Sequence, residues 1–168
     1  MNLMCTDVYT KGVQAGELAA AQLAEVGIKA HIVTVDRATF SAAWNGLTPE
    51  EFPDWGMFLM GAGYITLDGD EGLKRRFATS EDGKNSNNYG FYSNAEVDQL
   101  LNGAAATTDR EAREKAYQRA AEILYLEDPV GCYLNCRNET VVLSAQVEGF
   151  DMTPVGIYDW PNIKVRKK

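Results

Sequence analysis

Alternating apolar and polar stretches predict that strands and helices follow one another in the first part of the chain. Residues 2–8 and 28–35 are apolar runs of strand length, and the second is rich in β-branched residues. Between them, residues 13–26 carry an apolar stripe at helical spacing, and Gly27 follows where a helix favours a left-handed residue. Strand, helix and strand within about 35 residues predict a βαβ unit with parallel strands and a right-handed crossover.

The rest of the chain continues this alternation of strand and helix patterns. The run 57–60 is predicted to be a buried central strand, and residues 130–135 and 140–143 are predicted to be two further strands. Two short helices are predicted at 38–45 and 73–77. Two longer ones are predicted to open at residues 93–96 and 108–111 and to run to Ala106 and to about Leu126. Ser93 and Thr108 each begin a capping box, with a glutamate three residues later. The whole order predicts one α/β lobe, with a mixed, mostly parallel sheet flanked by helices.

The loop after the predicted central strand is the candidate ligand site. It contains Gly61-Ala62-Gly63, which leaves the main chain bare, and the acidic residues Asp68, Asp70 and Glu71 follow it. In an open α/β sheet, ligands bind beyond the carboxyl ends of the strands, so we expect this loop to line a ligand site. The alternative is a connecting turn whose acidic residues simply suit the positive end of the next helix.

Composition and charge narrow the class of partner. The chain has 168 residues and is 45% hydrophobic, enough for one packed core or for one lobe of a larger protein. A net charge of -8 and a pI of about 4.7 argue against binding nucleic acid or an anionic membrane. No apolar stretch reaches the roughly 20 residues that cross a bilayer, and residues 1–4 lack the apolar core of a signal peptide. Since the chain begins inside a predicted strand, we expect it to be part of a longer protein.

Candidate catalytic and cofactor residues are few. His31 is the one histidine and lies in a predicted strand, which argues against a nucleophile paired with a histidine base. Asp68-Gly69-Asp70 resembles the start of a calcium loop, but Thr79 stands where such a loop needs glutamate. The glycines after the central strand lack the further glycine or lysine of a nucleotide-binding loop. We therefore expect no cofactor, no metal and no catalytic residue.

The cysteines do not form a recognisable framework. Cys5, Cys132 and Cys136 are an odd number, without dense spacing. In an extended strand, four residues separate two Cα atoms by roughly 13 Å, which is too far for a disulfide between Cys132 and Cys136. We expect all three side chains to be buried free thiols.

Three segments of the chain carry a family resemblance. Residues 18–35, LAAAQLAEVGIKAHIVTV, contain a helix ending in Leu-x-x-x-Gly-Ile and the strand after it. Residues 89–101, YGFYSNAEVDQLL, are similar to a Tyr-Ser-Asn-Pro-Glu-Val-Asp motif, with Ala95 in place of proline. Residues 107–129 contain an Asp-x-x-x-Arg long helix that leads into a strand. Together these segments resemble the C-terminal α/β lobe of the family 5 extracellular solute-binding proteins, the dipeptide, oligopeptide and nickel receptors of bacterial ABC importers.

The resemblance implies a fold, a function and partners. Residues 1–146 would form a periplasmic-binding-protein-like lobe of type II, and residues 147–168 would return to a missing N-terminal lobe. A peptide or similar small solute would be trapped between the lobes and passed to the importer's membrane permease. The full-length protein would be periplasmic, or extracellular and attached to the membrane, and it would not be an enzyme. The implied ligand-binding residues are Gly61, Ala62, Gly63, Tyr64, Ile65, Thr66, Asp68, Asp70, Asn135 and Arg137.

The candidate loop departs from the family pattern at two positions. Many dipeptide receptors hold the α-amino group of the ligand with an aspartate, and Ile65 stands at that position here. Gly69 replaces a proline that follows in the family. The resemblance therefore implies that Asp68 or Asp70 takes over the role, or that the ligand differs.

Two other functions stay open at this point. One is a ligand-sensing module of a cytosolic transcription regulator, and the other is a small α/β hydrolase that uses Asp68 and Asp70 as acid and base. If the chain is an isolated lobe, it offers half a site, so we expect weak or undetectable ligand affinity. We also expect residues 147–168 to be poorly ordered or to dock on a neighbouring copy, since their usual partner surface is missing.

Overall fold

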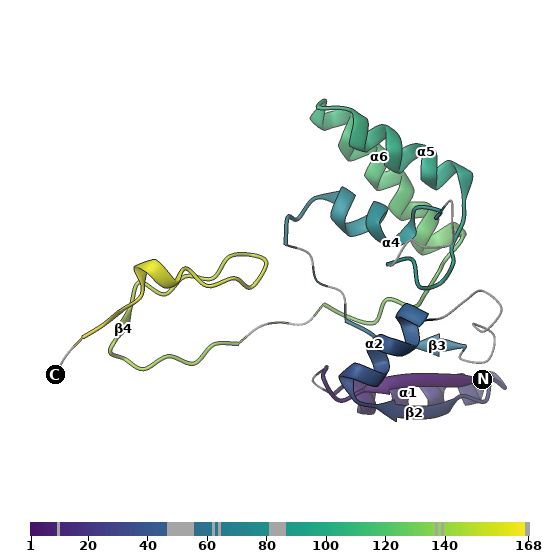
Figure 1. The fold of residues 1–168 in the computed structure, drawn as a ribbon, viewed down its shortest axis with the longest axis horizontal. Coiled ribbons are helices and arrows are strands. Elements are labelled where there is room, and N and C mark those ends of the chain that lie inside the picture. The colour runs from purple at the N-terminus through teal and green to yellow at the C-terminus, as the bar shows by residue number, and fades with distance from the viewer. Residues whose placement is uncertain are drawn as a thin grey trace.

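The chain folds into three regions in the computed structural model of Figure 1, which describes residues 1–9, 11–46, 56–61, 63, 65–80, 87–136, 138 and 140–166. The sheet region contains β1 (Asn2–Thr6), α1 (Gly12–Glu25), β2 (His31–Val35), α2 (Arg37–Gly46) and β3 (Met57–Phe58). The helical region contains η1 (Asp70–Lys74), α4 (Arg75–Phe77), α5 (Ala95–Ala106), α6 (Arg110–Glu122) and η2 (Ile123–Glu127). The C-terminal region contains β4 (Val147–Glu148), η3 (Trp160–Asn162) and β5 (Lys164–Val165).

The three-stranded sheet is parallel and has the strand order β2-β1-β3. Leu3 of β1 lies opposite Ile32 of β2 and Met57 of β3, and the Leu59 amide extends the second ladder by donating to the Met4 carbonyl at 2.9 Å. The predicted βαβ unit is confirmed. Since the chain moves from β1 to β2 in one direction and then back past β1 to β3, right-handed crossovers place α1 and α2 on opposite faces (Figure 1).

The first hydrophobic core lies on both faces of β1. Leu3, Met4 and Cys5 are fully covered, because β1 is the central strand and a helix packs on each face. Phe40 of α2 is buried as well, and its ring meets the Phe58 ring edge-on at a centroid distance of 6.1 Å. Burial of this kind, rather than helix propensity alone, holds α1 and α2 in place.

Gly16 lets α1 approach the sheet, and a pair of substitutions tests this. A Cβ on Gly16 would overlap the Cys5 Sγ, whereas a Cβ on Gly103 of α5 would meet nothing within 4 Å. Gly16→Ala is therefore expected to lower the free energy of unfolding by about 1–3 kcal/mol through overpacking. Gly103→Ala is expected to raise it by about 0.5–1 kcal/mol, because glycine is unfavourable inside a helix.

Urea unfolding of the two glycine variants measures both shifts. The double variant Cys5→Ala/Gly16→Ala removes the overlapping sulfur. Its loss of unfolding free energy is therefore expected to be smaller than the sum of the losses of the two single variants. A purely additive double variant would contradict the packing explanation.

The helices α5 and α6 begin at side-chain caps. The Asn94 carboxamide oxygen accepts hydrogen bonds from the amides of Glu96 and Val97 at 3.0 and 3.2 Å. The Asp109 carboxylate accepts from the amides of Glu111 and Ala112 at 2.9 and 3.1 Å. The prediction of Ser93 and Thr108 as caps was wrong by one residue each, because the adjacent asparagine and aspartate are at least as good acceptors for the free amides.

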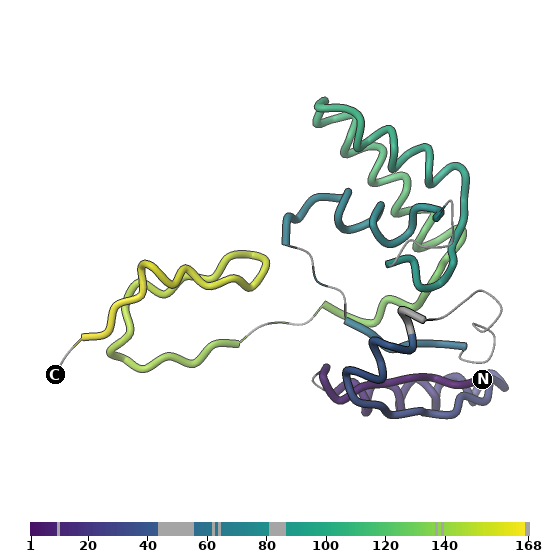
Figure 2. The backbone as a smooth tube through the Cα atoms, viewed as in Figure 1, coloured from purple at the N-terminus to yellow at the C-terminus, as the bar shows by residue number. Residues whose placement is uncertain are grey.

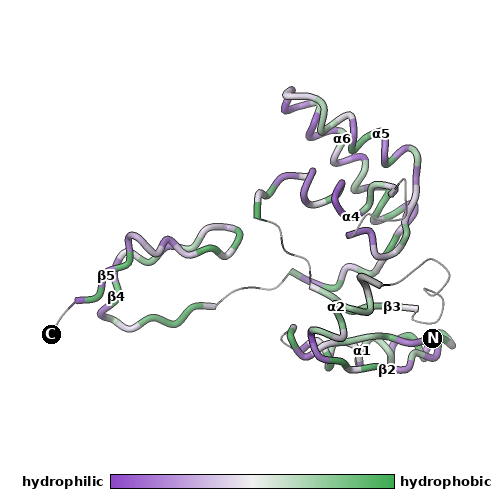
Figure 3. Tube along the Cα trace, viewed as in Figure 1, coloured by the Kyte–Doolittle hydropathy of each residue, from purple (hydrophilic) through white to green (hydrophobic). Residues whose placement is uncertain are grey.

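The second core lies between α5, α6 and η1. Its buried members are Val97, Leu101, Ala120, Ile123 and Leu124. Partly buried side chains surround them, namely Leu73, Phe77, Ala78, Tyr92, Leu100, Tyr117 and Val130. Figure 3 shows polar and apolar residues alternating along both long helices, as expected for helices with one buried face. The predicted end of α5 at Ala106 is confirmed, and the long helix ends as the π-helical turn η2 before Pro129.

The two strands predicted after the long helix were wrong. Residues 130–136, 138 and 140–143 run as an irregular segment without strand pairing. Their β-branched and apolar composition favours an extended chain, but a strand also needs a neighbour to complete its hydrogen bonds. The prediction of three buried thiols was wrong for two cysteines. Cys132 and Cys136 are exposed on this irregular segment, whereas Cys5 is buried as predicted.

The C-terminal region forms its own hairpin. Val147 pairs with Val165 and Glu148 with Lys164 in an antiparallel ladder. Phe150, Tyr158 and Trp160 form a chain of ring contacts, with centroid distances of 5.6 and 5.5 Å. Figures 1 and 2 show the hairpin projecting away from the sheet and the helices. The hairpin is a regular element that the sequence did not predict, whereas the division of the chain at residue 146 and the expectation that residues 147–168 are poorly ordered or dock on a neighbouring copy stay predictions.

The described helices are all too short or too polar to cross a membrane.

Candidate functional site

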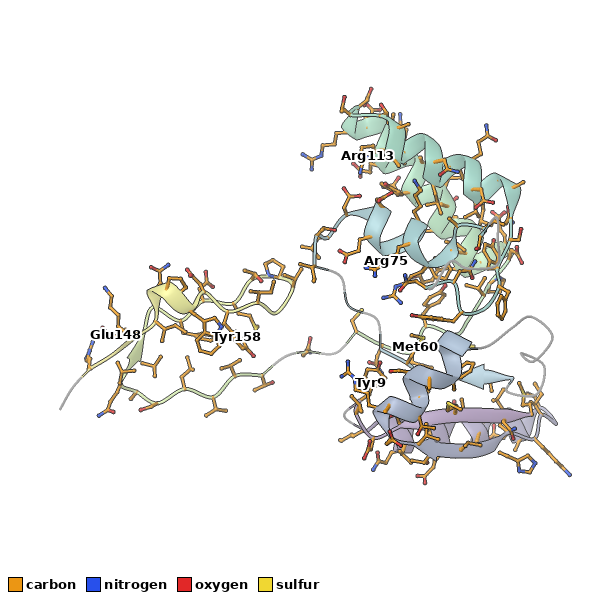
Figure 4. All side chains as sticks on the ribbon, in the orientation of Figure 1. Tyr9, Met60, Arg75, Arg113, Glu148 and Tyr158 are labelled. Carbon is orange, nitrogen blue, oxygen red and sulfur yellow. The ribbon has the colours of Figure 1, made fainter. Side chains whose placement is uncertain are left out.

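The predicted ligand loop begins where β1 and β3 end side by side. Tyr9 follows the carboxyl end of β1, and Gly61 follows that of β3. A Cβ on Gly61 would lie 2.8 Å from Cε1 of Tyr9, so the glycine is required for this close approach. Figure 4 shows Tyr9 and Met60 on this side of the sheet. The two strand ends therefore meet at one edge, as the parallel topology predicts.

Glu71 closes the loop that follows. One carboxylate oxygen, Oε2, accepts hydrogen bonds from the amides of Ile65 and Thr66, both at 2.9 Å. The Thr66 hydroxyl donates to the same oxygen at 2.8 Å. The Thr66 amide and hydroxyl, followed by the Ile65 amide, hold the pKa of Glu71 below its usual value, because they stabilise the charged form. Leu67 within this loop has a φ of 55°, an unusual value for a residue with a side chain.

Asp68 ties the loop to α6. Nη2 of Arg113 donates to both carboxylate oxygens at 2.9 and 2.8 Å. Nη1 of the same guanidinium donates to the Ala104 carbonyl at the end of α5, at 2.6 Å. The Asp70 amide and Arg113 lower the pKa of Asp68, in that order of effect. A single arginine thus connects the candidate loop with both long helices.

Gly69 packs against the aromatic ring of Tyr117. A Cβ on Gly69 would lie 2.6 Å from Cγ of that ring, and the guanidinium carbon of Arg113 lies 5.4 Å from the centre of the same ring. A proline, as in the resembled family, would not fit here without a shift of Tyr117. The departure from the family pattern at Gly69 therefore has a local packing reason.

An open pocket of about 550 Å³ lies beside this loop. It is lined by Thr66, Asp68, Asp70, Glu71, Lys74, Ala105 and Arg113. A second hollow of about 500 Å³ shares four of these residues and adds Arg75 and Ala78. The volume is in the range of small-molecule sites, roughly 300–1,000 Å³. The lining has three carboxylates and two cations, and Figure 4 shows Arg75 and Arg113 within the helical region.

The structure brings together part of the predicted ligand-binding set. Thr66, Asp68 and Asp70 line the pocket. Ile65 lies next to them and is exposed, Gly61 packs on Tyr9, and Gly63 has open space around it. Asn135 is exposed on the irregular segment and does not line the pocket. Ala62, Tyr64 and Arg137 lie outside the described residues.

Four pocket residues were missing from the predicted set, namely Glu71, Lys74, Ala105 and Arg113. Glu71 was visible as the last acidic residue of the loop, and Arg113 as the arginine of the Asp-x-x-x-Arg helix. No local signal could pair Arg113 with Asp68, because 45 positions separate them. Among the described residues, no group of three potential metal ligands occurs.

The hydrogen bonds of Glu71 predict a pH dependence of stability. A carboxyl whose folded pKa is lowered contributes stability above its unfolded pKa of about 4.3, and this contribution is lost as the pH falls through the folded pKa. Glu71→Gln is therefore expected to be less stable than the parent at pH 7, and the difference should shrink toward pH 3. Urea midpoints across this pH range measure it, with Glu25→Gln on α1 as the control. A difference that stays constant with pH would contradict the role of the carboxylate.

Known proteins with similar sequences are bacterial binding proteins. The probable D,D-dipeptide-binding periplasmic protein DdpA of Escherichia coli K12 is 40% identical over 68 residues, which is 40% of this chain and 13% of DdpA. The glutathione-binding protein GsiB of Salmonella choleraesuis is 33% identical over 108 residues, which is 64% of this chain and 21% of GsiB. The matched stretch of this chain therefore spans between 13% and 21% of the length of these two relatives. No profile of a known protein family matches the chain.

Solved structures with the same fold cover nearly the whole chain. A dipeptide-binding protein from Pseudoalteromonas sp. SM9913, in complex with Met-Leu, superimposes with a TM-score of 0.73 over 99% of this chain and 32% of its own, at 20% identity. HbpA2 from Haemophilus parasuis superimposes with a TM-score of 0.69 over 99% of this chain and 32% of its own, at 21% identity. The predicted fold class, a periplasmic-binding-protein-like α/β lobe, is confirmed.

Proposed function

We propose that this chain, a relative of the C-terminal lobe of the family 5 extracellular solute-binding proteins, forms one wall of a cleft that captures a small solute. The observation that carries the proposal is the pocket of about 550 Å³ next to the loop after β3, lined by Thr66, Asp68 and Asp70. The loop that supplies Thr66 and Asp68 follows β3, and open α/β sheets bind ligands beyond the carboxyl ends of their strands; the rest of the lining comes from η1, α5 and α6. The relatives DdpA and GsiB are named for binding a dipeptide and glutathione, so a short peptide is the solute class we infer.

The opposite wall would come from another lobe of the same protein. A pocket that is open on one side holds a ligand weakly, and closure of a second lobe about a hinge would bury it. The loaded receptor would then deliver the solute to the membrane permease of an ABC importer. The relative DdpA is named a periplasmic protein, and the same location, or an extracellular one with membrane attachment, suits this role. The hairpin 147–166 would contact the other lobe.

A binding role is better supported than an enzymatic one. Asp68 is held by Arg113, and its lowered pKa keeps it ionised at neutral pH, so it is a poor proton donor. The side chains of Asp68 and Asp70 are 45% and 54% exposed, so neither lies in the water-excluded setting that favours catalysis. The matched proteins of known name are binding proteins.

Nuclear magnetic resonance titration of the 168-residue chain with di- and tripeptides tests the proposed function. We expect the amide signals of residues 65–74 to shift, with dissociation constants of about 1 mM or weaker because only half of the cleft is present. Shifts confined to the C-terminal hairpin would contradict the location of the site. Micromolar binding by this chain alone would contradict the half-site.

A further inference from the structure

Cys132 and Cys136 are two exposed thiols on the segment that links η2 to the C-terminal hairpin. Residues 131–136 are all exposed, so a reagent in solution can reach both sulfur atoms. A Cα separation of roughly 13 Å holds for four residues of an extended strand, and the described structure shows no strand pairing at residues 131–136. The distance that argued against a disulfide therefore does not apply to this pair.

The spacing of the two cysteines suits closure of the chain between them. Residues i and i+4 lie on the same side of the chain both in an extended strand and in a helical turn. One helical turn brings their Cα atoms to roughly 6 Å, within the range of about 4.4–6.8 Å that a disulfide spans. Gly131 precedes the pair and has open space where a Cβ would lie, and glycine adopts turn conformations readily. The chain can therefore bend at this end of the pair.

Tyr133 fixes the same segment to the helical region. Its ring stacks on the ring of Tyr125 in η2, at a centroid distance of 3.8 Å and an interplanar angle of 25°. Since Tyr133 lies between the two cysteines in the sequence, this contact holds the segment that carries them against a helix. The chain between the thiols is short, so each thiol meets the other at a high effective concentration.

We propose that Cys132 and Cys136 form a reversible intramolecular disulfide by exchange with a small disulfide, such as oxidised glutathione. One cysteine thiolate attacks the reagent and releases a first reduced glutathione, and the second attacks the resulting mixed disulfide and releases another. The two electrons and two protons lost by the protein thiols reduce the reagent to two thiols. The inference rests on the proposed function only for a periplasmic or extracellular location, where disulfides persist. The bond restrains the link between η2 and the C-terminal hairpin.

Cys5 is an internal control for this reaction. Its side chain is 0% exposed on the central strand β1. Burial, followed by the negative charge of Glu17, raises the pKa of the Cys5 thiol, so little thiolate forms at neutral pH. We expect Cys5 to stay reduced under conditions that oxidise the exposed pair.

Reaction with oxidised glutathione, followed by mass spectrometry of the whole 168-residue chain, tests the proposal. At about 0.1 mM reagent, below the millimolar effective concentration of a neighbouring thiol, the singly glutathionylated chain should stay below about a tenth of the total. The product should lose the mass of two hydrogen atoms and run as a monomer on a non-reducing gel. Peptide mapping should place the bond between Cys132 and Cys136, and dithiothreitol should reverse it.

Three variants complete the test. Cys132→Ser and Cys136→Ser each leave one exposed thiol, so each should accumulate as a mixed disulfide with one glutathionyl group. Cys5→Ala keeps both exposed thiols and should lose two hydrogen atoms as the parent does. The two serine variants replace exposed side chains, so they are expected to fold like the parent.

The outcomes separate this inference from the proposed function. Addition of two glutathionyl groups to the parent, or disulfide-linked dimers in place of the closed monomer, would overturn the disulfide, because the two thiols would then not meet within one chain. A bond that involves Cys5 would overturn it as well. If the pair closes while peptides move no signal of residues 65–74, the disulfide stands and the proposed ligand wall fails. If peptides move those signals and the pair does not close, only the disulfide fails.

Discussion

Replacing Leu124 with alanine is expected to lower the free energy of unfolding by about 2–5 kcal/mol, the largest effect predicted for a single substitution in this chain. Leu124 is 0% exposed in the core between α5, α6 and η1. The substitution removes apolar contacts and leaves a cavity, because the surrounding helices relax only partly. Urea unfolding followed by circular dichroism at 222 nm measures the change, since most of the helix in the chain reports on this region.

Leu126→Ala is the matched control for the core substitution. It makes the same chemical change two residues along, where the leucine is 78% exposed, and should cost less than about 0.5 kcal/mol. Equal losses for the two variants would contradict the assignment of the core. Since η1 carries Asp70, Glu71 and Lys74, a loosened core should also disturb the pocket. Faster hydrogen exchange of the η1 amides in Leu124→Ala would report this coupling.

Replacing Arg113 with alanine is expected to cost about 2 kcal/mol and to release the candidate loop from α6. The guanidinium donates to both oxygens of Asp68 and to the carbonyls of Ala104 and Thr107, the last at 3.4 Å. Its side chain is 24% exposed, so these bonds are partly shielded from water. Urea unfolding gives the loss of stability, and hydrogen exchange of residues 65–72 should show the loop opening before the helices do.

Two controls separate the charge of Arg113 from its geometry. Arg113→Lys keeps the positive charge but cannot serve Asp68 and two carbonyls at once, so it should recover less than half of the loss. Asp68→Asn keeps the shape of the side chain and removes its charge, and it should open the loop while leaving the carbonyl contacts in place. A lysine variant as stable as the parent would show that charge alone suffices.

The sequence predicted those elements that local rules determine. The apolar periodicity located β1, β2, β3, α1, α2, α5 and α6, and the crossover rule predicted the parallel pairing of β1 with β2. The loop after β3 was identified as the candidate site from the strand that precedes it. The predictions of the elements and of the strand pairing succeeded because each depends on residues within a few turns of one another, or on a handedness shared by all L-amino acids, whereas the choice of this loop as the ligand site stays a prediction.

Other features needed the tertiary structure. The strand pattern at 130–135 and 140–143 predicted pairing, yet whether a strand forms depends on a free neighbouring edge, which no local pattern specifies. The same holds for the exposure of Cys132 and Cys136, which were predicted to be buried. The hairpin of β4 and β5 joins residues on opposite sides of a long irregular stretch, so its pairing was also missed.

By itself, the sequence determined the α/β order of the chain, its relatives and the loop in which to look for a ligand. Only the tertiary structure decided which groups of that loop are paired within the protein and which are exposed. Arg113 comes from a helix 45 positions away to pair with Asp68, Glu71 turns back to hold the amides of the loop, and Ile65 and Leu67 are left facing outward. The physical reason is that the sequence does not specify the hydrogen-bond partner of a carboxylate. Folding decides whether the carboxylate pairs with donors of the protein or stays available to a solute.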